Sequence, residues 1–526
     1  MNYDIKKKTK EKENNMKKTR ILLATMLFFT LTIFVGCEDY NYNNGVQTAT
    51  LGDVFECNWT SVDESESGDI MVNEDGFVSL PIIYIEAEHD RLTKEYEDCT
   101  ISVFSYNEEY TLIKEDAKIK VRGNQTSNFS KAPYRIKFNK KQSMLGLNDN
   151  LKAKSWVLLA EFTDRTMLKN LTALNLAKQI LGEDGYYVSD CKLVEVYING
   201  NYQGVYLLAE QQQVNKKRVN ITEPDDDYTG TDIGYLLEMD AYYEGEEYYF
   251  EMDFDDLVFI GGETIGANNF ERHYVIKSDI YSENQKQFAN DRLQNVWDVA
   301  YDAVFNDHTE HSYLKINDNN EIIEDDNIQS TFDAVSNVID VNSLVDMFIL
   351  HEICEDLDIG LSSFYMSFDF GTKGNKKLTF QAPWDFDWAL GQKRYVLNDF
   401  YTCARPNSLY RTTNPWFLLF CNQDWFMDMV AQKVQLMSRQ NVFDNIINMI
   451  NKYCEDYEMF FDRNFEVWPE CLTFVLNTHT SEEYENATTQ KEAADWLIEF
   501  LEARRDFLFS HFIPNEQGGE VIIIQN

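Results

Sequence analysis

Alternating apolar and polar positions predict a β-rich first part of the folded chain. Residues 134–138 alternate strictly, and further short apolar runs are rich in β-branched and aromatic residues, as strands usually are. Residues 194–198 and 202–208 flank Asn199-Gly200, a sequence typical of a tight hairpin turn. The remaining expected strands are 80–85, 100–104, 118–122 and 156–160.

The pattern changes to helical spacing later in the chain. One amphipathic helix is expected at 164–182, with Thr163 or Asp164 as N-cap and Gly182 just past its end. From about residue 341 the pattern is mainly helical and continues to about 512, interrupted by a hairpin at 364–368 and 378–380. This order predicts a two-lobed α+β domain over residues 80–512, with a β-rich N-terminal part and a mainly helical C-terminal part.

The N-terminus has the features of an export signal. Lys17, Lys18 and Arg20 precede an apolar run at 21–35, which is followed by Gly36 and Cys37. We therefore expect 1–36 to be a signal peptide with an N-terminal extension, and Cys37 to be lipidated. Residues 37–79 are then a lipidated polar tether, and 513–526 form a C-terminal tail. The predicted location is the extracytoplasmic side of a membrane, held there by the lipid. The alternative is an N-terminal anchor helix.

The amino-acid composition indicates which classes of binding partner the protein favours. The formal net charge is −42, from 89 acidic and 47 basic residues, which disfavours nucleic acid and favours cations or basic polypeptides. The stretch 219–271 contains no Lys or Arg, which suits a basic protein substrate. The alternatives are a solubilising acidic surface and a solvated or calcium-stabilised loop.

Residues 118–141 reverse this charge, with eight basic residues and no acidic one. If 118–122 and 134–138 are strands, Lys118, Lys120 and Arg122 share one face of the first, and Arg135 and Lys137 share one face of the second. Their apolar neighbours then face the core. Two basic faces joined by a loop containing Gly123 and Asn124 form a plausible polyphosphate cradle. The alternative is a basic surface patch that balances acidic neighbours.

Acidic residues gather in two later segments. One segment contains Asp385 and Asp387, which are flanked by Trp384, Phe386 and Trp388. The aromatic neighbours would partly shield both carboxylates from water, which costs free energy unless a cation binds between them. Mg²⁺ is the expected cation, because it takes carboxylates together with phosphates and waters. The alternative is that the pair caps a helix or a turn. Asp356 and Asp358 lie on a connection between a helix and a strand, where catalytic residues often occur.

Several motifs, in order and spacing, resemble the CotH family of spore-coat-type atypical protein kinases. The resemblance covers residues 80–512. The motifs are 122–124 (Arg-Gly-Asn), 131–138 (Lys-Ala-Pro-Tyr-Arg-Ile-Lys-Phe), 156–160, 164–170, 194–200, 202–208, 234–238, 363–365 and 384–387 (Trp-Asp-Phe-Asp).

The resemblance implies a divergent protein-kinase-like fold that binds ATP with Mg²⁺ and phosphorylates Ser or Thr of proteins. By analogy, Lys137 contacts the nucleotide phosphates, Arg122 supports the phosphate loop, and Asp358 orients the attacking hydroxyl. Asp385 is the principal metal ligand and Asp387 supports it. The remaining residues assigned to ATP binding are Lys120, Asn124, Arg135 and Glu210.

The chain departs from the family pattern in two places. Gln211 follows Glu210 where relatives often have Lys, and Ser362-Ser363 stand near Asp358 where an Asn metal ligand is expected.

Two other functions use the same residues. A noncatalytic surface-binding lipoprotein would keep the fold without turnover. A hydrolase of nucleotides or phosphate esters would use the same cradle and metal with water as the acceptor, and would release phosphate without labelling protein.

Overall fold

The computed structural model describes residues 50–51, 59–61, 69–73, 77–258, 262, 264–391, 414–474 and 482–513. These residues belong to one compact unit. Cys37 and the expected signal peptide lie outside them. Among the described residues, no helix is both long enough and apolar enough to cross a membrane.

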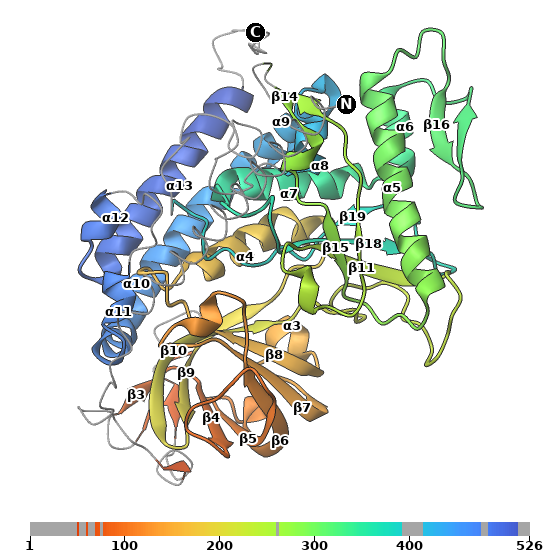
Figure 1. Ribbon diagram of the computed structural model, residues 1–526. Helices are drawn as coiled ribbons and strands as arrows, with labels where there is room; N and C mark the ends of the chain where they lie inside the picture. The colour runs from red at the N-terminus through yellow and green to blue at the C-terminus, as the bar shows by residue number, and fades with distance from the viewer. Residues whose placement is uncertain are drawn as a thin grey trace, which may run out of the picture. The chain divides into compact units, whose positions relative to one another are not determined.

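Seven strands close into a barrel, drawn at the bottom of Figure 1. Neighbouring strands are antiparallel except β4 and β9, which pair in parallel and close the ring. Alternate side chains point inward, so Ile119, Ile136 and Trp156 fill the interior at 0% exposure. The barrel order is β10-β8-β7-β6-β5-β4-β9. The bounds are β4 Ile82–Ala87, β5 Glu97–Phe104, β6 Leu112–Val121, β7 Tyr134–Gln142, β8 Ala153–Leu159, β9 Cys191–Ile198 and β10 Asn201–Glu210.

The hairpin between β9 and β10 forms where the sequence predicts it. Asn199 and Gly200 both have positive φ, 49° and 85°, as a two-residue type I′ turn requires. At Gly204 of β10, φ is 92° and an added Cβ would lie 2.4 Å from the Asn464 Oδ1 atom. This glycine therefore lets a C-terminal helix approach the barrel wall closely.

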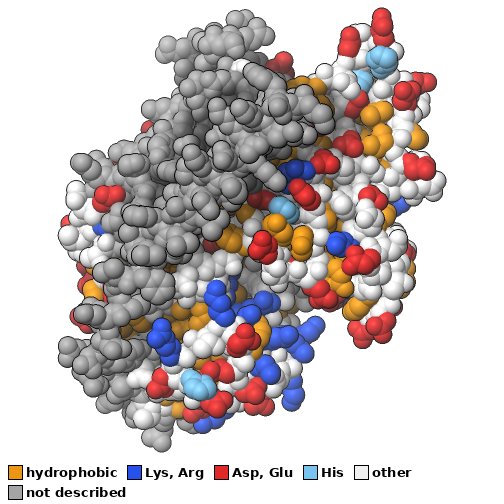
Figure 2. Space-filling view, in the orientation of Figure 1, with side chains coloured by type: hydrophobic (Ala, Val, Ile, Leu, Met, Phe, Trp, Pro, Cys, Tyr) orange, Lys and Arg blue, Asp and Glu red, His pale blue; other side chains and the backbone are white. Residues whose placement is uncertain are grey.

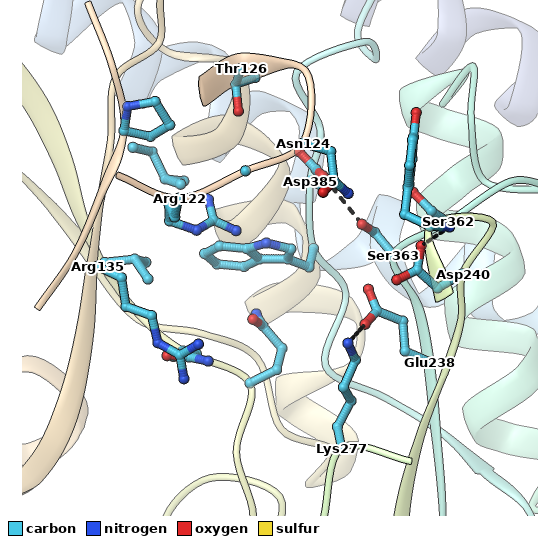
Figure 3. Close-up of a pocket in the computed structure, with 18 of the residues that line it drawn as sticks. Arg122, Asn124, Thr126, Arg135, Glu238, Asp240, Lys277, Ser362, Ser363 and Asp385 are labelled. Atoms are coloured by element: carbon cyan, nitrogen blue, oxygen red, sulfur yellow. Dashed lines mark hydrogen bonds and ion pairs between the residues drawn. The ribbon is translucent and has the colours of Figure 1, made fainter. Parts of the chain in front are cut away.

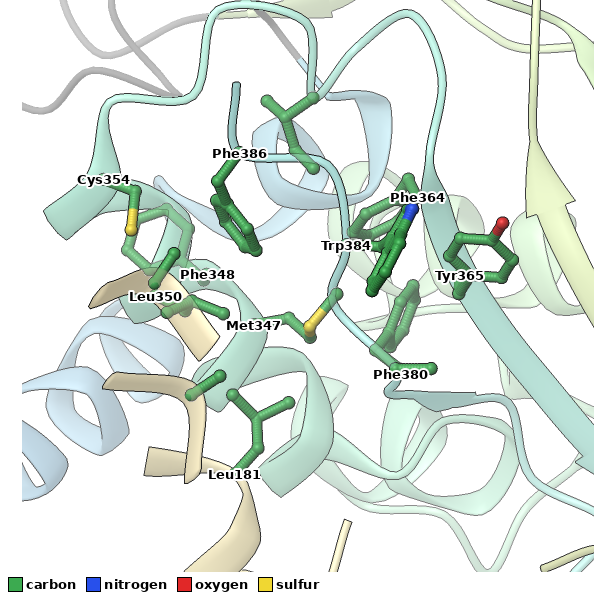
Figure 4. Packing of buried hydrophobic residues seen from close by; sticks show 14 of the residues in the cluster. Leu181, Met347, Phe348, Leu350, Cys354, Phe364, Tyr365, Phe380, Trp384 and Phe386 are labelled. Atoms are coloured by element: carbon green, nitrogen blue, oxygen red, sulfur yellow. The ribbon is translucent and has the colours of Figure 1, made fainter. Parts of the chain in front are cut away.

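A second sheet of five strands lies above the barrel in Figure 1, with order β12-β15-β11-β18-β19. Its strands are β11 Gly234–Met239, β12 Tyr249–Glu251, β15 His273–Ile276, β18 Phe364–Asp369 and β19 Thr379–Phe380. The expected hairpin of β18 and β19 is confirmed by the pairing of Met366 with Phe380. Helix α7 (Val341–Cys354) packs beside β19, and Figure 4 shows its Met347, Phe348 and Leu350 in one apolar cluster with Trp384 and Phe386.

Helices make up most of the described chain after residue 330. Helix α5 was not expected from the sequence, although Leu293, Val296 and Ala300 carry helical spacing on its buried face. The bounds are α3 Leu147–Asn150, α4 Lys169–Ile180, α5 Glu283–Phe305, α6 Thr331–Val338, α7 Val341–Cys354, α8 Pro415–Phe420, α9 Asp424–Arg439, α10 Val442–Val467, α11 Glu470–Thr473, α12 Glu482–Asn486 and α13 Gln490–Phe512.

Helix α4 begins at Lys169 and not at Asp164, so the expected N-cap was wrong. Met167 has a φ of 57°, which interrupts helical geometry before the helix starts. Asp164 still serves the helix, because its carboxylate accepts hydrogen bonds from the backbone N–H groups of Leu168 and Lys169 at 2.9 and 2.8 Å.

Short strands precede the barrel and further hairpins follow it. They are β1 Thr60–Ser61, β2 Met71–Val72, β3 Val78–Ser79, β13 Leu257–Val258, β14 Thr264–Ile265, β16 Tyr313–Ile316 and β17 Ile322–Asp325. Ser79, assigned from the sequence to the tether, donates a 2.5 Å hydrogen bond to buried Glu195 of β9. Glu195 also pairs with Arg463 of α10 at 2.9 Å, so this carboxylate joins β3, the barrel and the helices.

The α+β class is confirmed, with a β-rich N-terminal half and a helical C-terminal end. The protein-kinase-like arrangement of two lobes stays a prediction.

Candidate active site

A cavity of about 1000 Å³ lies between the outer face of the barrel and the five-stranded sheet. Strands β6 and β7 contribute one wall, and β11, β15 and the segment 358–388 contribute the other. Figure 3 shows Arg122 and Arg135 on one side, Glu238, Asp240 and Lys277 on the other, and Asp385 between them. The cavity therefore has a basic wall and a mainly acidic wall.

The strand pairing of β6 and β7 creates the basic wall. Lys120 is opposite Arg135, and Ile119 is opposite Ile136, so the basic and apolar residues occupy opposite faces as expected. Lys120 and Arg135 line the cavity. The Nε atom of Arg135 is buried without a hydrogen-bond partner among the described residues, and burial lowers the pKa of this guanidinium. In Figure 2 the Lys and Arg side chains gather over the barrel.

The loop after β6 closes over this wall. Gly123 has a φ of 88°, and an added Cβ would lie 2.1 Å from the Thr126 Oγ1 atom, so the turn requires glycine. Asn124 and Thr126 line the cavity (Figure 3). The Arg122 guanidinium lies 5.6 Å from the centre of the Trp384 ring, which couples the basic wall to the Trp-Asp-Phe-Asp motif.

Asp385 and Asp387 are held by different partners. Asp385 has a φ of 70° and accepts a 3.2 Å hydrogen bond from the Ser363 hydroxyl. Asp387 accepts a hydrogen bond from the Asn170 amide, whose oxygen accepts one from the Phe386 N–H at 2.9 Å. Burial, followed by repulsion from Asp385, raises the pKa of Asp387 to about 7.

Asp358 also lines the cavity, on the connection that follows α7. Burial and the neighbouring Asp356 raise the pKa of Asp358 well above its usual range. Burial raises the pKa of Asp356 to about 7, with further repulsion from Asp385 and Asp387. The cavity thus brings Asp358 together with Asp385 and Asp387, which are distant in sequence.

Two residues assigned to nucleotide binding lie elsewhere. Lys137 is exposed, pairs with Lys118 across the strands, and does not line the cavity. Glu210 is fully buried, forms a 2.9 Å ion pair with Arg218 and also accepts from the Asn148 amide. Because its oxygens are used in this way, Glu210 supports the end of β10, while the following residue, Gln211, lines the cavity.

The sequence did not identify four buried polar residues, of which Lys131 and Glu161 line the cavity and Lys169 and Asn170 do not. Burial lowers the pKa values of Lys131 and Lys169 to about 8. Burial and Asp387 raise the pKa of Glu161, which accepts from Asn170 at 3.2 Å. Asn170 is thus an amide beside Asp387, although the segment after Asp358 lacks the expected Asn. Lys131, Lys169 and Asn170 lie within the family motifs, but nothing in the sequence distinguishes Glu161.

The side chains present suit a hard divalent cation. Asp358, Asp385 and Asp387 offer carboxylate oxygens, and burial, followed by repulsion between neighbouring carboxylates, raises the pKa values of Asp358 and Asp387. A cation would relieve this repulsion. In the described part of the chain, no three His, Cys, Asp or Glu side chains form a preformed metal-binding group. Mg²⁺ fits this arrangement, because it commonly uses one or two carboxylates plus phosphates and waters.

A family model matches most of the chain. No curated protein matches the chain. The family model described as CotH kinase protein matches residues 119–508, which is well over half of the chain and includes both walls of the cavity. The chain therefore belongs to the CotH kinase protein family.

Proposed function

We propose that this protein is an Mg²⁺-dependent kinase-like enzyme that transfers phosphate from ATP to Ser or Thr side chains of proteins. The observation that carries the proposal is that Arg122, Asp358 and Asp385 line the same cavity. Phosphoryl transfer depends on positioning and on neutralising charge, and a basic wall facing a carboxylate cluster can supply both.

The basic wall would bind the polyphosphate. Lys120, Arg122 and Arg135 present cations on one barrel face, and the loop from Gly123 to Thr126 provides backbone N–H groups. Lys131 is a better candidate than Lys137 for a phosphate contact, because Lys131 lines the cavity and Lys137 does not. Its Nζ atom donates one hydrogen bond, to the Val205 carbonyl at 2.5 Å, and an ammonium group has three donors.

The carboxylates would serve the acceptor and the metal. In the transfer step, the acceptor hydroxyl oxygen bonds to the γ-phosphorus, the bond from that phosphorus to the β–γ bridging oxygen breaks, and ADP leaves. Asp358 would orient the hydroxyl and accept its proton. Asp385 and Asp387 would hold Mg²⁺, whose chemistry when bound is to neutralise phosphate charge.

The substrate and location follow from charge and from the N-terminus. Glu246, Glu247 and Asp279 line the cavity beside Asp240, so a basic Ser- or Thr-rich protein segment would complement this wall. The sequence around Cys37 supports export and a lipid anchor on the extracytoplasmic side of a membrane. A spore-coat role does not follow from family membership.

The test incubates the purified protein with γ-labelled ATP, Mg²⁺ and a basic Ser-rich acceptor protein. Asp385→Ala is the site variant, and Asp318→Ala is the matched control because Asp318 keeps 98% of its side chain exposed. We expect label on protein with wild type and Asp318→Ala but not with Asp385→Ala.

Other results identify the alternatives. Phosphate release without protein labelling would favour a hydrolase. The absence of both turnover and Mg²⁺-dependent ATP binding would contradict the catalytic proposal and favour a noncatalytic binding protein.

A further inference from the structure

A fully buried arginine lies on the face of α13 that packs into the protein. Arg504 has 0% exposure and occupies the same helical stripe as Leu497, Leu501 and Leu508. The other buried positions of this stripe near Arg504 are apolar. A charged residue at such a position is costly unless its donors are all directed at acceptors.

Acceptors for Arg504 lie at the C-terminal end of α7, on Glu352 and on the cap residue Glu355. Arg504 donates to the Glu352 carbonyl oxygen at 3.2 and 2.8 Å through Nε and Nη2. Its guanidinium also forms 3.3 Å ion pairs with the carboxylates of Glu352 and Glu355. All three side chains are at most 1% exposed. One guanidinium thus donates hydrogen bonds to a terminal helix carbonyl and lies within ion-pairing distance of two buried carboxylates.

This contact lies where the backbone changes direction toward the cavity. Glu355 has φ 45° and ψ 53°, a left-handed conformation that is unfavourable for a residue with a side chain. Asp356 and Asp358 follow within three residues. Nearby, the Cys354 carbonyl accepts a 2.6 Å hydrogen bond from Leu390 N–H, just after the Trp-Asp-Phe-Asp motif. Both acidic segments of the cavity are therefore tied to the end of α7.

We propose that Arg504 is a positioning residue: by fixing the left-handed turn at Glu355, it holds Asp358 in the geometry that phosphoryl transfer requires. The inference rests on the proposed function. Arg504 does not line the cavity, so it acts through Glu352 and Glu355. A buried Arg–Glu–Glu group is a poor source of net stability compared with apolar packing, whereas it defines one backbone geometry well.

The test compares Arg504→Lys and Glu355→Gln with Arg505→Ala. Arg505 is the matched control, because it is adjacent on α13, 25% exposed, and paired with half-exposed Asp444. Glu355→Gln keeps the size of the side chain and leaves Arg504 paired with Glu352, so it remains informative if Arg504→Lys does not fold. Hydrogen–deuterium exchange and steady-state kinetics are measured on each full-length protein.

We expect faster exchange confined to residues 355–363, with α13 and the first turns of α7 unchanged. For transfer, kcat should fall about 10- to 100-fold, the loss typical of a small misplacement of reacting groups. KM for ATP should stay within about threefold of wild type, because the basic wall is untouched. Arg505→Ala should match wild type in both measurements.

Unchanged exchange at 355–363 in both site variants would overturn the inference, as would equal loosening of α7 and α13 along their lengths. A folded variant with local loosening but wild-type kcat would also overturn it. A wild-type protein without transfer activity would instead contradict the proposed function, and the exchange pattern would still decide whether Arg504 fixes the turn.

Discussion

The charged side chains of β6 and β7 stand on the outer face of strands whose other face forms an apolar core, whereas Glu352, Glu355 and Asp356 at the end of α7 are at most 2% exposed. Lys137 of β7 is exposed and needs no specific partner. Asp356 and Glu355 are at most 2% exposed, and burial raises both of their pKa values to about 7. The two regions supply opposite charges to one cavity, but the free-energy cost of removing the charged groups from water is much higher for the second region.

This difference explains how each region is organised. Exposed charges follow from strand alternation alone, and substitutions among them should be tolerated. Buried charges require partners that are fixed in place, and here those partners come from distant elements: Asn170 of α4 for Asp387, and Arg504 of α13 for Glu355. We therefore expect changes to the buried group to have the largest effects.

The largest expected effect is on catalysis at Asp358. Asp358→Asn removes the proposed proton acceptor, so kcat should fall about 10²- to 10⁴-fold. The thermal midpoint should not fall, because an amide has nearly the size of the carboxyl group and carries no charge for Asp356 to repel. Asp98→Asn on β5, where the side chain is 86% exposed, should leave kcat unchanged. A comparable loss of kcat in both variants would show that the exposure of a charged side chain does not predict its effect on catalysis.

The sequence predicted the barrel region better than the buried acids because different physics determines them. Alternation at 134–138 and the Asn199-Gly200 turn are local signals, and the strand faces and hairpin they predict are confirmed. The closed barrel itself depends on the parallel pairing of β4 with β9, which no local pattern encodes.

The aromatic residues around Asp385 and Asp387 made this acidic pair a candidate site from the sequence alone. The hydrogen bond from Asn170 to Asp387 could not be predicted in this way, because it joins residues 217 positions apart in the chain. Lys137 shows the reverse case: alternation places it on the basic strand face, as the pairing of β6 and β7 confirms, but only the tertiary structure shows that Lys137 does not line the cavity.

Glu195 is a fully buried carboxylate within the barrel. It therefore tests whether the burial of an ion pair determines how much free energy of unfolding is lost when the pair is broken. Arg463→Met removes its cationic partner and should lower the free energy of unfolding by about 3 kcal/mol, the usual cost of breaking a buried pair. Lys452→Met on the same helix breaks an i,i+4 pair with Asp456 that is partly exposed, and should cost less than about 0.5 kcal/mol. Urea denaturation measures both. Equal losses would mean that burial does not set the free-energy cost of breaking the pair.

Arg122 and Lys137 sharpen the comparison within the barrel itself. Both are basic, but Arg122 lines the cavity and stacks on Trp384, whereas Lys137 does neither. Arg122→Ala should raise KM for ATP about tenfold, which corresponds to about 1.4 kcal/mol. Lys137→Ala should change it less than about twofold, an expectation based on its exposure. A larger effect at Lys137 would restore it as the phosphate contact.

The smallest effect is expected at a charge pair far from the cavity residues in sequence, in the β16–β17 hairpin. Lys315, whose side chain is 39% exposed, donates a 2.6 Å hydrogen bond to Asp325. This bond, with one from the Asn327 N–H, lowers the pKa of Asp325 from 3.8 to about 2. A depressed carboxyl pKa stabilises the folded state above the ordinary pKa, and this contribution is lost as pH falls from about 4 to about 2. Asp325→Asn should therefore be slightly less stable than wild type in urea denaturation at pH 6, and the difference should shrink as pH falls below about 4. A difference that stays constant down to pH 3 would assign the effect to side-chain shape, because an amide and a carboxyl group differ in charge only while the carboxyl is ionised.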